Sequence, residues 1–92
     1  MTGSTRSSDG LDDRRRRVLY RAWHRGTREM DLVVGRFTDE VIAELDEADL
    51  TAYERLLNVP DPELYAWIIG EYPVDPDYDS PVFRRLKSFH EG

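Results

Sequence analysis

The chain has 92 residues, no cysteine and a formal net charge of −6. This length allows one small domain and leaves little room for a cofactor domain or a deep substrate cavity, which argues against an independent enzyme. Without cysteine, the chain can form no disulfide, thiolate metal site or catalytic thiol. No apolar run approaches the roughly 20 residues that span a bilayer, and no apolar signal segment is visible, so we expect a cytoplasmic protein without membrane insertion.

The charge is distributed unevenly along the chain. Residues 1–36 contain nine Arg against five Asp or Glu, a net charge of +4, whereas residues 37–92 contain four Arg or Lys against fourteen Asp or Glu, a net charge of −10. The acidic part disfavours wrapping by nucleic acid and argues against tight self-association. We therefore expect a monomer when free, with one charged face suited to a protein partner.

Helix signals are frequent and strand signals nearly absent, which predicts an all-α fold of about five short helices. Residues 1–10 are rich in Ser, Thr and Gly and predict a disordered tail. The first helix is expected from Leu11 or Asp12 to His24, with Asp12 and Asp13 at its positive end. Gly26 is expected to end this helix in a left-handed backbone conformation.

The middle of the chain predicts two further short helices. Met30 begins the apolar face of a helix expected over residues 27–34, and Gly35 is expected to stop it. Thr38 or Asp39 is then expected to cap a third helix, with Phe37 as a staple residue ahead of it.

The second half of the chain has clearer helix boundaries. Asp46 is expected to cap a fourth helix that ends near Asn58. Asp61 is expected to cap a fifth, which Gly70 terminates. Together these elements predict a helical bundle domain over residues 11–72. Residues 73–92 are expected to be an extended, mobile linker over 73–79 followed by a short helix that opens at Ser80-Pro81.

The run Arg14-Arg15-Arg16-Arg17, extended by Arg21, is a candidate for nucleic-acid binding. Consecutive arginines spread over all faces of a helix, and no helix-turn-helix pattern or RNA-binding aromatic signature accompanies them. A solvated helix face is the favoured interpretation, and a small nucleic-acid-binding module using Arg14 to Arg21 is the alternative.

The two histidines do not predict a metal site. His24 and His90 are far apart in the sequence, and no H-x-x-x-H spacing exists. The acidic residues near Asp46 are explained by capping, so no carboxylate pair is assigned to catalysis. We expect no catalytic, metal or stably bound cofactor site.

The segment between the first two predicted helices contains Arg25, Gly26 and Glu29. Within one helix, Arg25 and Glu29 would form a surface ion pair worth only about 0.2–0.5 kcal/mol, but Gly26 favours a turn between them. Two interpretations remain: a turn with a local salt bridge, or a rigid corner that offers an arginine and a carboxylate to a partner. Trp23, beside this corner, is a candidate for partner contact.

Residues 16–31 resemble the beginning of the SdhE family of succinate dehydrogenase assembly factors. Arg25, Gly26 and Glu29 match the R-G-x-x-E motif of that family, and Asp31 matches the acid that often follows it. The later stretches 53–57 and 61–68 also resemble the family in the expected order, so that the resemblance covers about residues 14–70.

The resemblance implies a small all-helical bundle that is not an enzyme. It implies binding to the flavoprotein subunit of succinate dehydrogenase and/or fumarate reductase, where the helper favours the bond between a flavoprotein histidine and the flavin 8α carbon. The helper would hold no cofactor stably and would act on the FAD of its partner, by stabilising the aligned arrangement of histidine and flavin.

The resemblance also assigns roles to the corner. Arg25 and Glu29 would dock near the flavin site, Gly26 would allow close approach, and Arg28 and Asp31 would flank the contact. The chain departs from the family at position 24, because a mostly neutral histidine stands where a basic residue is frequent. This predicts a weaker or mildly pH-dependent contact. We expect Glu29→Ala or Gly26→Arg to leave the fold intact and abolish stimulation of flavinylation.

Overall fold

Helices make up the regular structure of the computed structural model, which describes residues 10–92. The elements in chain order are α1 (Asp13–Ala22), α2 (Arg28–Met30), the π-helical segment η1 (Asp31–Gly35), α3 (Arg36–Val41), α4 (Glu47–Leu56), α5 (Asp61–Ile69), the 3-10 helix η2 (Pro76–Tyr78) and α6 (Pro81–Glu91). No strand occurs among these residues, so the predicted all-α class is confirmed. Apart from Gly10, the predicted tail lies outside the described residues.

The chain divides into two packed units, one up to Leu45 and one from Asp46 on. No helix within residues 10–92 has the length and apolar character needed to cross a membrane. The domain limits predicted at 11–72 and 73–92 stay predictions.

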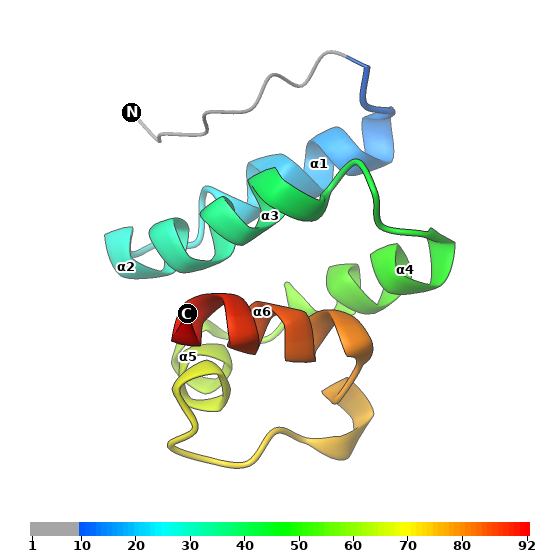
Figure 1. The fold of residues 1–92 in the computed structure, drawn as a ribbon. Helices are drawn as coiled ribbons and strands as arrows, with labels where there is room; N and C mark the ends of the chain where they lie inside the picture. The colour runs from blue at the N-terminus through cyan, green and yellow to red at the C-terminus, as the bar shows by residue number, and fades with distance from the viewer. Residues whose placement is uncertain (1–9) are drawn as a thin grey trace. The chain divides into compact units, whose positions relative to one another are not determined.

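The first unit is built around α1, which lies beside η1 and α3 (Figure 1). Asp12, expected within the first turn of α1, is instead its cap, since its carboxylate accepts a hydrogen bond from the Arg15 amide at 2.8 Å. The inward face of α1 is apolar, and Val18 and Ala22 are both buried. They pack in a core with apolar residues of η1 and α3, of which Val34 and Phe37 are fully enclosed.

The predicted break at Gly35 is wrong, because α2, η1 and α3 follow one another without interruption from Arg28 to Val41. Gly35 has helical torsions (φ −63°, ψ −46°) and lies against the indole of Trp23. Thr38, expected as a cap, is instead buried inside α3, where its hydroxyl donates to the Val34 carbonyl at 2.7 Å. Phe37 is likewise a core residue of α3 and not a staple ahead of it. The glycine serves packing here, which local sequence signals do not reveal.

The second unit begins with α4, whose predicted cap is confirmed by a hydrogen bond of 2.8 Å from the Asp49 amide to Asp46. Gly70 ends α5 in the left-handed conformation (φ 82°), also as expected. Asp61 was expected to cap α5, and this is wrong: Pro60 occupies the cap position and Asp61 is the first residue of the helix. An aspartate in the first turn still complements the helix dipole.

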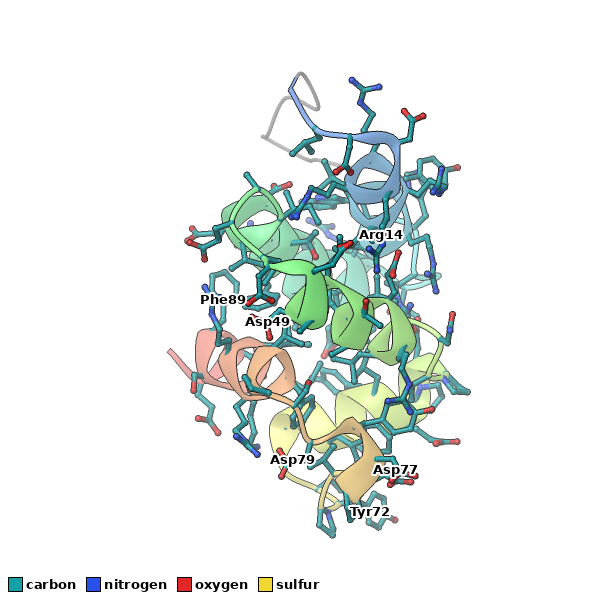
Figure 2. All side chains as sticks on the ribbon, turned by 90° about the vertical axis from the view of Figure 1, so that its right-hand side faces the viewer. Arg14, Asp49, Tyr72, Asp77, Asp79 and Phe89 are labelled. Atoms are coloured by element: carbon teal, nitrogen blue, oxygen red, sulfur yellow. The ribbon has the colours of Figure 1, made fainter. Side chains whose placement is uncertain are left out.

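The connection between α5 and α6 is more ordered than the predicted extended linker. Residues Pro76–Tyr78 form η2, in which Asp75 accepts from the Asp77 amide at 2.9 Å. The ring centroids of Tyr78 and Trp67 lie 5.6 Å apart. The guanidinium carbon of Arg55 lies over the Tyr78 ring, 5.0 Å from its centroid. Figure 2 shows Asp77 and Asp79 along this connection. Stacking against α4 and α5 accounts for the turn, because it buries aromatic surface that an extended chain would expose.

The last helix, α6, belongs to the core of the second unit. The helix opens at Ser80-Pro81 as expected, and Ser80 caps it by accepting from the Phe83 amide at 3.2 Å. Val82, Phe83 and Leu86 are buried, and α6 packs against α4 and α5.

Candidate partner-binding site

A sharp turn joins α1 to α2 and contains the motif found in the sequence. α1 ends at Ala22, and Gly26 adopts φ 117°, a value that favours glycine. Thr27 then caps α2, because its hydroxyl accepts from the Met30 amide at 3.2 Å. The expected positive torsion at Gly26 is therefore confirmed, but the expected helix end at His24 and Gly26 is wrong, because α1 ends at Ala22 with Trp23 as its cap. A side chain at this position would strain the turn, so Gly26→Arg alters the backbone as well as the surface.

Glu29 lies exposed in the first turn of α2. Within residues 10–92 its carboxylate forms no hydrogen bond or ion pair, so the alternative of a local salt bridge with Arg25 is not found. Arg25 is half-buried and lies before the helix, while Arg28 is exposed beside Glu29. The turn thus presents a carboxylate in solvent together with neighbouring arginines.

Asp31 follows α2 and forms a hydrogen bond back to the start of the turn. One of its carboxylate oxygens accepts the backbone N–H of Arg25 at 2.7 Å, across six residues. The Asp31 side chain is half-buried, and hydrogen bonds to a charged acceptor are among the stronger ones in proteins. This hydrogen bond therefore joins the start of the motif, at Arg25, to the residue that follows its end, Asp31.

Trp23 supports the turn from within the first unit. Its side chain is only 4% exposed, and its indole N–H donates to the Asp39 carboxylate at 3.1 Å. The ring also lies against Gly35. The sequence pointed to Trp23 as a partner contact but did not point to Gly35 or Asp39 as its supports. These contacts span 12 and 16 residues, and no local pattern could reveal them.

His24 and Tyr20 form a stacked pair beside the turn, with ring centroids 3.9 Å apart and an interplanar angle of 15°. The His24 Nδ1 atom lies 2.7 Å from the Tyr20 carbonyl oxygen. Because a carbonyl only accepts, Nδ1 must carry the hydrogen in this geometry. The pair is well exposed, with Tyr20 at 65%.

The basic run of α1 does not form one continuous surface. Arg15 donates to the Ile42 carbonyl at 2.5 Å and pairs with Asp12, and Arg16 lies 3.4 Å from Asp13. These two arginines therefore have partners within their own unit. No observation on this helix favours the nucleic-acid alternative.

The histidines are used in ring contacts. His90 lies edge-on to Tyr65 with centroids 6.3 Å apart, and His24 stacks on Tyr20. In the part of the chain that the structure describes, no group of three or more His, Asp or Glu residues is arranged to hold a metal ion.

The described residues thus form a small all-helical scaffold with a charged surface turn, which a hydrogen bond from the Arg25 amide to the Asp31 carboxylate holds in place. The family model described as the flavinator of succinate dehydrogenase matches residues 16–90. The chain belongs to this family.

Curated relatives share this similarity over most of the chain. The FAD assembly factor SdhE of Acetobacter pasteurianus is 39% identical over 80 residues, which cover 87% of the chain and 73% of that relative. Succinate dehydrogenase assembly factor 2, mitochondrial, of Scheffersomyces stipitis is 37% identical over 71 residues, or 77% of the chain and 48% of the relative. The Dictyostelium discoideum protein of the same name is 32% identical over 77 residues, covering 84% and 55%. The chain thus spans about half the length of these mitochondrial relatives.

Proposed function

We propose that this protein is an FAD assembly factor. It binds the flavoprotein subunit of succinate dehydrogenase, of fumarate reductase, or of both, and promotes covalent attachment of FAD to that subunit. The membership of the flavinator family and the names of the relatives support this function. The protein holds no FAD stably itself, and the flavin it acts on stays with the partner.

The turn between α1 and α2 is the proposed contact surface, with Arg25, Gly26 and Glu29 at its centre and Arg28 beside them. The observation that carries this assignment is the exposed Glu29 carboxylate, which has no ion pair among the described residues although arginines flank it in the sequence. In the first turn of α2 this carboxylate complements the helix dipole, but it makes no hydrogen bond or ion pair with other described residues. Its exposure supports a surface kept for another molecule.

The chemistry of flavinylation belongs to the flavoprotein and its FAD. The assembly factor contributes affinity for the arrangement in which the reacting groups are aligned. A partner that binds this arrangement more tightly than others raises its population. Attachment then becomes faster, because the flavin and the reacting group of the flavoprotein are already oriented toward each other when the bond forms.

The test measures covalent FAD on the cognate flavoprotein by in-gel flavin fluorescence, in cells that contain the wild-type protein, no copy of it, or Glu29→Ala. We expect a strong loss without the protein and a similar loss with Glu29→Ala, at unchanged thermal stability. Glu40→Ala is the matched control, because Glu40 is also an exposed carboxylate of the first unit without a described partner.

Full flavinylation in every strain would refute the proposed function. A loss only when the protein is absent, with Glu29→Ala equal to wild type, would move the contact surface away from this turn. Running the assay on succinate dehydrogenase and fumarate reductase separately identifies the partner. The cytoplasmic location and the monomeric free state stay predictions, the latter open to sedimentation analysis.

A further inference from the structure

We propose that Asp31 is a positioning residue for the partner-binding turn. It acts by holding the Arg25 amide, and its carboxylate does not contact the partner. This inference rests on the proposed function, since it explains how the turn is prepared to bind the flavoprotein.

The geometry places the Asp31 carboxylate across the base of the turn. It accepts the Arg25 N–H at 2.7 Å, which is the amide directly before Gly26. Gly26 at φ 117° is the residue with the greatest backbone freedom in this segment. On its other side, Thr27 holds the Met30 amide, and Met30 is buried at 3% exposure. The flexible glycine is therefore enclosed between two hydrogen bonds.

Glu29 lies between these two fixed points in the sequence. The direction in which its side chain leaves the backbone depends on the conformation at Gly26 and on the start of α2. If the Arg25 amide were released, the turn would sample several conformations, and binding would have to select one of them. Fixing a loop before it binds removes this entropic cost from the binding step.

The half-buried position of Asp31 agrees with a role inside the turn. Its carboxylate already has a short hydrogen bond to the backbone, whereas the exposed Glu29 carboxylate has none among residues 10–92. The two acids of the motif therefore differ in role. Glu29 meets the partner, and Asp31 orients the backbone that carries Glu29.

The test compares Asp31→Ala with Asp31→Asn in binding to the FAD-loaded flavoprotein subunit, with Glu40→Ala as the control. Asparagine keeps an oxygen that accepts the Arg25 N–H but removes the charge. We expect Asp31→Ala to weaken binding by about tenfold and Asp31→Asn by less than about threefold, as loss of a pre-ordered conformation predicts. Equal losses in both variants would show that the charge itself matters and would overturn the proposal.

A double-mutant cycle with Glu29→Gln tests whether Asp31 acts through Glu29. We expect the effect of Asp31→Ala to shrink to less than about threefold when Glu29 is already replaced, because the oriented charge is gone. Fully multiplicative losses would contradict a positioning role, since they would mean that the two acids act independently.

Amide hydrogen exchange of Arg25, followed by NMR on the free protein, tests the bond without any partner. We expect slow exchange in the wild type and in Asp31→Asn, and fast exchange in Asp31→Ala. An unprotected Arg25 amide in the wild type would overturn the proposal even if Asp31→Ala failed to fold. Should every strain flavinylate fully, including the one without the protein, the proposed function fails, while the exchange result still reports on the Asp31 bond.

Discussion

Gly26 and Gly35 lie nine residues apart and meet different requirements. Gly26 is needed for its torsion, φ 117°, which side chains rarely adopt. Gly35 has ordinary helical torsions and is needed for its lack of a side chain, because an added Cβ would lie 2.5 Å from Cδ2 of Trp23. Gly26 could be predicted from its place after a helix, whereas the reason for Gly35 depends on a residue 12 positions earlier.

We predict that Gly35→Ala destabilises the protein by about 1–3 kcal/mol, the usual cost of overpacking a core against a rigid group. Urea unfolding followed by circular dichroism measures this change. As a control, Trp23→Leu combined with Gly35→Ala should lose less than the sum of the two single variants, because the smaller side chain makes room. Wild-type stability in Gly35→Ala would contradict the contact.

Helix α6 is part of the packed core of the second unit because of its contacts with neighbouring helices. The sequence predicted its start at Ser80, a local cap, but left its role open. In the structure its apolar face is buried against α4 and α5, and Leu86 is fully enclosed. Lys87 adds a hydrogen bond of 3.2 Å from its ammonium group to the Ile68 carbonyl, near the end of α5. The segment expected as a C-terminal extension is therefore part of the second unit.

We predict that Leu86→Ala lowers the free energy of unfolding by about 2–5 kcal/mol, the range for removing a buried leucine side chain. Ser88→Ala is the control on the same helix, and we expect it to change stability by less than about 0.5 kcal/mol because Ser88 is exposed. Thermal unfolding of both variants gives the comparison. Equal midpoints would show that α6 contributes no core packing.

At the scale of the whole molecule, charge is the dominant property. The net charge of +4 over residues 1–36 contrasts with −10 over residues 37–92. The proposed contact turn lies in the basic part, where residues 13–28 contain seven arginines and one aspartate. A basic surface attracts an acidic surface of a partner. Dissolved salt screens the charges and shortens the range of this attraction.

We predict that association with the flavoprotein slows at least several-fold when ionic strength rises from about 0.05 M to about 0.5 M, with little change in dissociation. Stopped-flow measurement of both rates tests this. Arg17→Gln should reduce the salt dependence, because Arg17 is exposed on α1 and has no described partner. A salt-independent association rate would rule out electrostatic steering by the basic segment.

The all-α class, several helix ends and the turn at Gly26 could be predicted from the sequence alone. These features depend on signals within a few residues: a capping acid at Asp46, and a glycine at Gly26 or Gly70 that takes a positive torsion. The motif at the turn also stands out in the sequence alone, so the resemblance to the family could be found there.

Features that depend on distant contacts come from the tertiary structure. It made residues Arg28–Val41 continuous through Gly35, because the glycine accommodates the Trp23 ring. It turned Pro76–Tyr78 into a packed 3-10 helix through contacts with Arg55 and Trp67. It also gives the two motif acids different surroundings, since only folding brings the Arg25 amide to Asp31 and leaves Glu29 in solvent. Short-range preferences fix where helices begin and end, whereas packing and hydrogen bonds across many residues fix what each side chain does.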